Sequence, residues 1–417
     1  MTTTSTPIAS ATATAGPDSR HAWLRLATAL LLSTIGGVGM WSVPVVLPVL
    51  QTEFGIARGA ASLPFTLTMI GFAFGGVMMG RLADRFGIVV PAAIGAVMIC
   101  LGYLAAGLST SFWQFALAQG LLIGFLGSSA TFGPLLADIS HWFVRRRGIA
   151  VGICASGNYL AGAVWPPILQ HFITTIGWRQ THIAVGVFCM VTMLPLALLL
   201  RRRLPPAPAN AAAGAAPLRH REVALSGTTL QTLLIIAGVA CCVAMSMPQV
   251  HLVAYCGDLG YGTAIGAQML SVMLACGIVS RLASGWISDR IGGVATLLLG
   301  SALQGVALTL YLFFDGLLSL YIISALFGLF QGGIVPSYAI IVREYFPSSE
   351  AGTRVGLVLM ATLFGMALGG WMTGAIFDLT GSYQAAFLNG ILFNLTNVSI
   401  VAWLIRSSGR QPQLAAA

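Results

Sequence analysis

The chain has 417 residues, of which 57% are hydrophobic and only 7% are charged, and its formal net charge is +9. Soluble globular proteins carry roughly 25% charged residues, so this composition excludes a soluble protein and indicates a chain that crosses a membrane repeatedly. Every basic residue other than histidine is an arginine, and these arginines flank apolar stretches rather than forming one patch. A nucleic-acid-binding protein is therefore excluded despite the positive charge.

The first half of the chain contains six apolar stretches long enough for transmembrane helices, which need about 20 residues each. They cover residues 24–50, 59–80, 88–109, 111–138, 148–174 and 180–201, spans one to six. We predict a six-helix bundle over residues 22–202. Residues 1–21 are rich in Thr, Ala and Ser and lack an apolar core, so we expect a disordered cytoplasmic tail there rather than a signal peptide.

The second half repeats this plan after a segment rich in Pro and Ala, residues 203–226, which we interpret as a cytoplasmic linker. Spans seven to twelve follow at residues 227–256, 262–286, 293–314, 316–345, 352–378 and 381–406. They predict a second six-helix bundle over residues 227–406 and a cytoplasmic tail over 407–417. The predicted fold class is an all-α polytopic membrane protein with twelve transmembrane helices in two six-helix bundles.

Glycine spacing within the spans predicts where helices approach one another closely, because glycines four residues apart leave a groove. Such pairs occur at Gly71/Gly75, Gly120/Gly124, Gly148/Gly152, Gly365/Gly369 and Gly370/Gly374. We interpret these glycines as packing positions rather than as chemistry.

The distribution of arginines predicts the orientation in the membrane. Arg58 and Arg179 fall on one side and Arg281 within a span, whereas the other 17 of the 20 fall on the side of the N-terminus. Cytoplasmic loops carry an excess of positive charge, so we predict that both termini are cytoplasmic, in a bacterial cytoplasmic (inner) membrane. Most of the seven cysteines lie within spans and give no disulfide framework.

Two loops carry the same pattern of charge. GRLADRFG, residues 80–87, follows span two, and GWISDRIG, residues 285–292, follows span eight. A carboxylate is stabilised at a helix N-terminus by the helix dipole. We therefore expect Asp84 to meet the start of span eleven, and Asp289 the start of span five, as latches that favour an outward-open state. The alternative is that these charges only orient the protein. The predicted latch residues are Gly80, Arg81, Asp84, Arg85, Gly87, Arg147, Gly285, Asp289, Arg290 and Arg354.

Two halves of six spans in the same orientation are a repeat architecture of transporters. Over residues 22–406 the chain resembles the major facilitator superfamily, whose loop between spans two and three is similar to GRLADRFG. This resemblance implies transport by alternating access between the two bundles.

Arg281 lies within span eight, eight residues before Asp289, which is about 12 Å along a helix and close to the middle of a bilayer. A charge at this depth is costly and usually faces a cavity that serves function. No carboxylate is predicted at the same depth, so an anion from outside would neutralise the guanidinium, whose planar fork suits a carboxylate. A single positive charge favours a monocarboxylate over a dicarboxylate. The structural alternative is an arginine bonded to backbone carbonyls.

Span eight and the loop before span five bear a closer resemblance. SRLASGWISDRIG (280–292), RRRGIAVGICASGNYLAGAVWPPI (145–168) and the first span resemble the monocarboxylate transporter and oxalate–formate antiporter families. The resemblance implies that Arg281 binds the substrate carboxylate. Gly277 stands where animal members of these families have an acidic residue, and span one has no lysine. Proton symport and anion exchange both remain open.

Other polar or aromatic residues within the spans are candidates for lining the same cavity. They are Trp41, Phe132, Asn158, Tyr159, Gln304, Gln331 and Phe364. Asn158 and Gln331 are preferred because amides inside spans need partners. Each of the seven could instead join one helix to another.

The chain lacks a P-loop, paired catalytic carboxylates, a metal-ligand cluster and a sizeable soluble domain, so we predict neither an enzyme nor a cofactor or metal. The preferred function is a secondary active transporter of a small organic anion, with H⁺ or a counter-anion as the second ion. We expect a monomer in the lipid bilayer. The alternatives are a major facilitator exporter of a drug or other small molecule, and a substrate sensor that does not transport.

Overall fold

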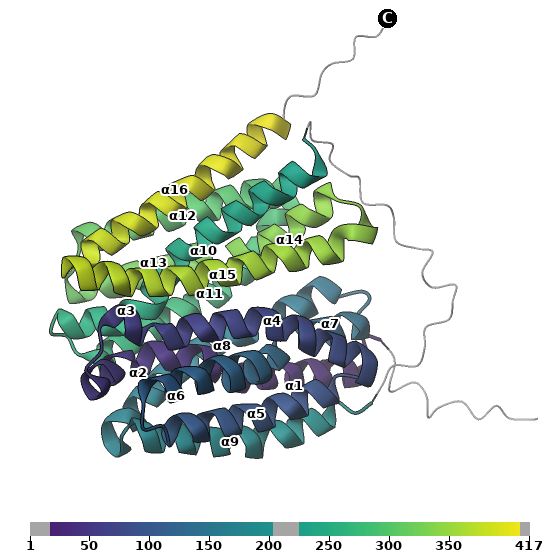
Figure 1. Cartoon of the computed structure of the whole chain (residues 1–417). Helices are drawn as coiled ribbons and strands as arrows, with labels where there is room; N and C mark the ends of the chain where they lie inside the picture. The colour runs from purple at the N-terminus through teal and green to yellow at the C-terminus, as the bar shows by residue number, and fades with distance from the viewer. Residues whose placement is uncertain (1–16, 203–224, 409–417) are drawn as a thin grey trace, which may run out of the picture.

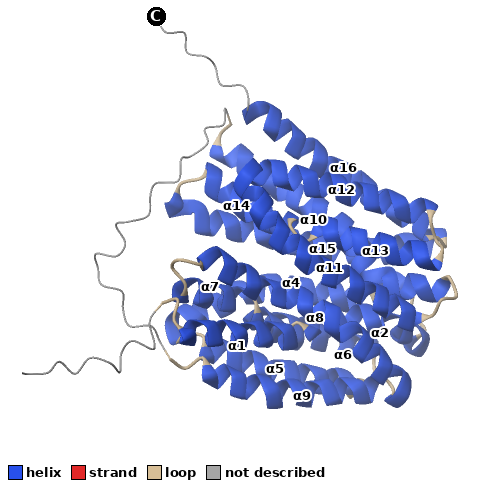
Figure 2. Ribbon diagram, turned by 180° about the vertical axis from the view of Figure 1, so that it is seen from behind, coloured by secondary structure: helices blue, strands red, loops and turns tan. Residues whose placement is uncertain are grey.

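The computed structural model describes residues 17–202 and 225–408, and the regular structure in these ranges is helical (Figure 2). Within them, twelve spans are long and apolar enough to cross a membrane. The prediction of an all-α protein with twelve transmembrane helices is therefore confirmed. Most of the two predicted tails and of the predicted linker lies outside the described residues. The predicted tail boundaries are wrong by two residues at each end, because α1 begins at Arg20 and α16 continues to Ser408.

The first six spans contain several helices that are interrupted within the membrane. Span one is α1 (Arg20–Gly36) and α2 (Val38–Phe54), span two is α3 (Arg58–Ala61) and α4 (Leu63–Phe86), and span three is α5 (Val89–Gly107). Span four is α6 (Phe112–Leu117), the π-helix η1 (Ala118–Gly127), the 3₁₀-helix η2 (Ser128–Thr131) and α7 (Gly133–Trp142). Spans five and six are α8 (Arg147–Ile176) and α9 (Trp178–Leu199).

The second six spans are more regular, with one interruption. They are α10 (Gly227–Asp258), α11 (Thr263–Ile291), α12 (Gly293–Phe313), α13 (Leu317–Gln331) with α14 (Ile334–Tyr345), α15 (Ser348–Thr380) and α16 (Tyr383–Ser408). The interruption falls in span ten, which is the counterpart of the interrupted span four in the first half. Backbone that leaves the helix inside a membrane must be buried in protein or line a cavity.

The spans form two bundles stacked on one another (Figure 1). Helices α1–α9, purple to teal, make the lower bundle in that view, and α10–α16, green to yellow, make the upper one. Between the bundles, α8 packs against α11, and α4 packs against α15. We call the end where α9 ends and α10 begins the linker end, and the opposite end the distal end.

The two similar loops close with the same backbone turn. Gly87 and Gly292, the last residues of GRLADRFG and GWISDRIG, have φ angles of 85° and 84°. Side chains with a Cβ rarely adopt this conformation, so both loops need glycine there to turn directly into the next span. The matching turns give physical support to the internal repeat.

Glycine packing follows the prediction for four of the five pairs. A Cβ on Gly75 would lie 2.1 Å from the Phe125 carbonyl oxygen, and one on Gly369 would lie 2.4 Å from that of Val243. Gly148 and Gly152 differ, because a Cβ on either would meet no atom within 4 Å. The packing prediction is wrong for this pair, since the face of α8 that carries these two glycines meets open space in this structure.

The bundles are joined at the distal end and separated at the linker end. From the distal end inward, the α8–α11 contact is joined by Gln170 Nε2 to Thr263 Oγ1 at 2.8 Å and by Ser271 to the Ala163 carbonyl. Its last hydrogen bond, among the described residues, joins Arg281 to Ala155. Closer to the linker end, Gly285 of α11 and Gly356 of α15 have open space beside them. The structure is therefore closed at the distal end and open at the linker end.

Candidate functional site

Arg281 lies on α11 where the two bundles last touch. Its Nη1 donates to the carbonyl oxygen of Ala155 at 2.8 Å, across the bundle interface, and its Nε donates to the carbonyl oxygen of Gly332 at 3.3 Å. Its guanidinium carbon lies 4.3 Å from the centre of the Tyr159 ring. No carboxylate of the described residues forms an ion pair with it. The structural alternative, bonding to backbone carbonyls, is thus what this state displays.

The break in span ten explains how the positive charge is held without a carboxylate. Helix α13 ends at Gln331, and the C-terminus of a helix carries a partial charge of about −0.5. The break also leaves the Gly332 carbonyl available to Arg281. The face of the Tyr159 ring adds a cation–π attraction. All these partners are neutral groups, so the guanidinium keeps its net charge.

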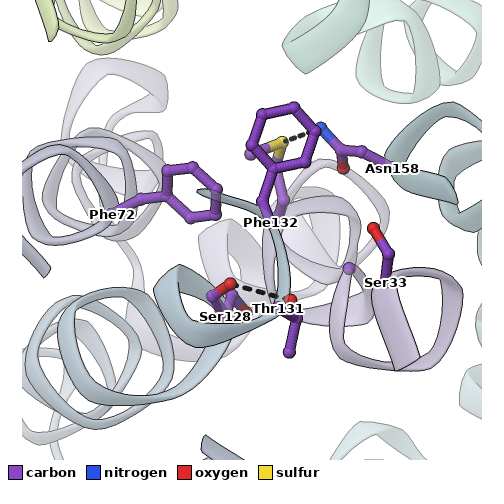
Figure 3. Close-up of a pocket in the computed structure, with 8 residues that line it drawn as sticks. Ser33, Phe72, Ser128, Thr131, Phe132 and Asn158 are labelled. Atoms are coloured by element: carbon purple, nitrogen blue, oxygen red, sulfur yellow. Dashed lines mark hydrogen bonds between the residues drawn. The ribbon is translucent and has the colours of Figure 1, made fainter. Parts of the chain in front are cut away.

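A small pocket lies inside the first bundle (Figure 3). It is lined by Ser33, Gly37, Met40, Phe72, Ser128, Thr131, Phe132 and Asn158. Asn158 belongs to α8, three residues after the Ala155 carbonyl that receives Arg281. The free space is about 10 Å³, which suits one water molecule. The pocket is a small, mostly apolar recess with a few polar side chains in its lining, rather than a complete substrate cavity in this state.

The structure brings three of the predicted residues together around span five. Trp41 donates its indole N–H to the Asn158 backbone oxygen at 3.0 Å and to the Asn158 side-chain oxygen at 3.3 Å. The Asn158 amide nitrogen lies 3.6 Å from the Met40 sulfur. Tyr159, the next residue, lies under Arg281. Asn158 therefore joins spans one and five while also lining the pocket.

Gln331 is fully buried one residue before Gly332, at the break in span ten. Its side-chain oxygen accepts a hydrogen bond from Gln249 Nε2 at 3.0 Å. Its own amide nitrogen has no partner among the described residues, nor does the Gln249 oxygen. A buried polar atom without a partner costs about 1–3 kcal/mol, so this amide pair is suited to a further polar ligand. The sequence analysis did not identify Gln249.

The remaining candidates lie in different places. Phe132 lines the pocket, 6.2 Å from the Phe72 ring, and Phe364 contacts Phe74 of the other bundle with ring centres 5.8 Å apart. Gln304 contacts the Cys241 carbonyl and the Asn394 amide, both within the second bundle. The structure therefore places Gln304 in an internal polar cluster and not beside Arg281.

The predicted latch contacts are not formed in this open-linker-end state. Asp84 and Asp289 are not buried, and neither forms an ion pair within the described part of the chain. Arg354 instead pairs with Glu350 on its own helix, and Arg147 donates to Ser140. Since the latches are expected to close the linker end, a structure open at that end leaves them a prediction.

Sequence reasoning missed two charged clusters. Arg25 of span one forms a buried ion pair with Asp138 of span four. At the distal end, Arg58 binds Asp258 of the other bundle. The available signal was the occurrence of opposite charges at span ends on the same side of the membrane, but it does not say which charges meet.

Twelve spans in two bundles, with a charged residue where the bundles touch, define the class of two-bundle secondary transporters. The chain belongs to the major facilitator superfamily, because the profile described as Major Facilitator Superfamily matches residues 29–318 and 272–416. The predicted family is therefore confirmed, and its members are transporters rather than enzymes.

Individual relatives extend this result. The chain is 30% identical to "Monocarboxylate transporter 13" of Bos taurus, over 93% of this chain and 90% of that protein. It is 28% identical to "Monocarboxylate transporter 11" of Mus musculus, over 94% and 89%. It is also 27% identical to "MFS-type transporter opdF" of Penicillium oxalicum, over 79% and 77%. The resemblance to monocarboxylate transporters is thus a distant homology.

Solved structures support the fold. A mutant of the nucleoside transporter NupG aligns with a TM-score of 0.70 at 15% identity, over 93% of this chain and 99% of that one. A bacterial homologue of the human lysosomal transporter Spinster aligns with a TM-score of 0.65 at 17% identity, over 93% and 96%. At these identities the likeness shows the fold alone.

Proposed function

We propose that this major facilitator transporter moves a small organic anion, a monocarboxylate, across the cytoplasmic membrane by alternating access. The observation that carries the proposal is the charge of Arg281 at the bundle contact, held by the Ala155 and Gly332 carbonyls and the Tyr159 ring, with no carboxylate paired to it among the described residues. A guanidinium binds a carboxylate through two parallel hydrogen bonds, which would displace these weaker neutral partners. The names of the 30% and 28% identical relatives support the same substrate class.

The position of Arg281 also suggests how binding couples to movement. Its two carbonyl partners belong to different bundles, Ala155 to the first and Gly332 to the second. An anion that takes over these hydrogen bonds releases the contact between α8 and α11 at its innermost point. Substrate binding would therefore favour rearrangement of the bundles, either with a proton or in exchange for a second anion.

Uptake into proteoliposomes tests the substrate class. We expect saturable uptake of at least one monocarboxylate and weaker uptake of dicarboxylates, because one guanidinium neutralises one carboxylate. Stimulation by an inward proton gradient would indicate symport, and stimulation by internal anion would indicate exchange. Flux of a neutral or cationic compound without carboxylate flux would favour the exporter alternative. Specific binding without any flux would favour the sensor.

We also propose that the linker end is cytoplasmic. The support is the excess of arginine on that side, 17 of 20 residues, together with the rule that positive loops stay inside. Epitope tags at residue 10, within 205–217 and at 415 should be reached only after permeabilisation. A tag inserted after Gly260, in the distal turn, should be reached on intact cells. The reverse pattern would contradict the orientation.

A further inference from the structure

The contacts at the distal end join the two bundles through one arginine. Arg58 begins α3 in the first bundle, and its guanidinium binds both carboxylate oxygens of Asp258, the last residue of α10. The same guanidinium donates to the Tyr383 hydroxyl at 2.8 Å and lies 4.0 Å from the centre of the Phe377 ring. Asp258, Tyr383 and Phe377 all belong to the second bundle, so these interactions exist only while the distal end is closed.

A second carboxylate reaches across the same interface. Asp378, near the end of α15, accepts hydrogen bonds from the backbone N–H groups of Arg58 at 2.8 Å and Gly59 at 2.7 Å. These N–H groups open span two, where a carboxylate satisfies free backbone donors and the positive end of the helix dipole. The approach is close, since a Cβ on Gly374 would lie 2.8 Å from the Arg58 carbonyl oxygen. Asp378 therefore caps a helix of the opposite bundle.

We infer that Arg58, Asp258 and Asp378 form a distal clamp that holds this end closed and must break each time the transporter opens to that side. The clamp combines a two-pronged guanidinium–carboxylate pair with a carboxylate cap, and charge-assisted bonds of this kind are stronger than neutral ones. The inference rests on alternating access by the proposed function, and it assigns to Arg58 a conformational rather than a substrate-binding role.

The clamp has a counterpart at the linker end of the same two spans. Span two begins at the clamp, capped by Asp378 of span eleven, and ends with Asp84, which forms no ion pair among the described residues. We expect Asp84 to meet the start of span eleven in the state that is closed at the linker end. Spans two and eleven would then be joined by one carboxylate at each end, Asp378 at the distal end and Asp84 at the linker end. Removing the Asp378 carboxylate should favour opening of the distal end, and removing the Asp84 carboxylate should favour opening of the linker end.

The same face of the molecule offers a matched control. Glu53 of α2 pairs with Arg179 of α9 and accepts from the Trp178 indole. All three residues belong to the first bundle, so opening the distal end leaves this pair intact. Loss of the Glu53 charge removes one distal ion pair, as loss of Asp258 does, without touching the bundle interface.

Cysteine accessibility measures the clamp directly. Ala367→Cys reports on the distal side, because Ala367 is buried and its carbonyl binds Thr66 across the interface. Gly152→Cys reports on the linker side, where its Cβ position meets open space. Each reporter cysteine is introduced into a background variant whose native cysteines are replaced by serine or alanine. Its labelling is measured first with the clamp residues unchanged.

Arg58→Gln, Asp258→Asn and Asp378→Asn should each raise labelling of Ala367→Cys from the distal side and lower labelling of Gly152→Cys. The expected change is about tenfold for Arg58→Gln, whose buried guanidinium loses several charge-assisted bonds at once. It is about two- to fivefold for the two aspartate variants, because Asp258 and Asp378 are exposed and water screens their charges. Tyr383→Phe, which removes one hydroxyl, should give a smaller shift in the same direction. Asp84→Asn should shift labelling the opposite way, and Glu53→Gln should leave both reporters unchanged.

Unchanged labelling of both reporters in the clamp variants, or an equal shift in Glu53→Gln, would overturn the clamp. If the three charge variants do not fold, Tyr383→Phe decides, because it retains the ion pair and the cap. Labelling requires no substrate, so these results are independent of whether carboxylates are transported. Absence of carboxylate uptake would contradict the proposed function while leaving the clamp result to stand.

Discussion

Replacing Arg281 with alanine or glutamine should weaken monocarboxylate binding by about ten- to over a hundredfold. A hydrogen bond to a charged group contributes roughly 1.5–3 kcal/mol, which corresponds to that range of affinity. In the described part of the chain, two backbone carbonyls and an aromatic ring hold the guanidinium. None of these groups is a cation that could bind the carboxylate once Arg281 is removed. Binding of a radiolabelled monocarboxylate to purified protein measures the loss.

Arg281→Lys separates charge from geometry. Lysine keeps the positive charge but presents it as a compact ammonium without the planar fork. We expect binding weaker than wild type and stronger than in Arg281→Ala. The control is Arg343→Gln, which removes a positive charge at an exposed position in the last turn of α14. Its affinity for the monocarboxylate should stay close to that of the wild type.

Stability must be followed in the same variants, because Arg281 also bonds to both bundles. Removing it leaves the Ala155 and Gly332 carbonyls without this donor. Gly332 is buried, and a buried carbonyl without a partner costs about 1–3 kcal/mol, so we expect the variants to remain folded with a decreased melting temperature. Wild-type carboxylate affinity in a folded Arg281→Ala protein would show that the arginine is only a structural contact and would refute the proposed site.

The fold was predictable because the membrane imposes it. Twelve apolar stretches, their lengths and the repeated GRLADRFG and GWISDRIG loops follow from composition and spacing alone. Counting residues along a helix from Asp289 likewise placed Arg281 well inside span eight, and it lies within α11 in the structure. Its partners were not predicted, although the sequence carries a signal for one of them: Pro336 has no backbone N–H, so it cannot bond the carbonyl four residues earlier and leaves the Gly332 carbonyl free for Arg281.

The rotation of each helix about its axis limited the prediction of the site. Spans that are apolar on every side carry little periodic signal, so the sequence could not say which face Gln304 occupies. In the structure that face points to α10 and α16 within its own bundle. The same uncertainty hid Gln249, whose amide meets Gln331.

Contacts between the bundles were the least accessible to sequence reasoning. Arg58 and Asp258 are 200 positions apart, and Arg58 and Asp378 are 320 apart. A transporter also uses alternative sets of contacts in different states, and one sequence encodes them all. The sequence indicated the linker-end latches through the repeated loops, whereas the structure displays the distal contacts that have no such repeat.

The buried pair of Arg25 and Asp138 should be the most sensitive position for stability. Arg25 Nε and Nη2 donate to the two Asp138 carboxylate oxygens at 2.7 and 2.8 Å, and the two side chains are only 3% and 17% exposed. Arg25 Nη1 also donates to the carbonyls of Leu200 and Arg202 at 3.0 and 2.9 Å. This one side chain thus ties α1 to α7 and to the end of α9.

Removing either partner alone leaves a buried charge without its counter-ion, which costs about 3–5 kcal/mol. Arg25→Met and Asp138→Leu should therefore each lower the apparent melting temperature strongly. The double variant should recover part of the loss, because apolar residues can replace a buried ion pair with little penalty. Its recovery is expected to be incomplete, since methionine cannot donate to the Leu200 and Arg202 carbonyls.

The matched control is Glu350→Gln, which breaks the partly exposed pair of Arg354 and Glu350 on a single helix. Exposed pairs of this kind contribute little, so its melting temperature should be close to that of the wild type. The measurement is thermal unfolding of the four variants and the wild type in the same detergent and lipid. Equal, small effects of Arg25→Met and Glu350→Gln would mean that water reaches the Arg25 pair. Additive losses in the double variant would mean that the two charges do not depend on each other, against the geometry that joins them.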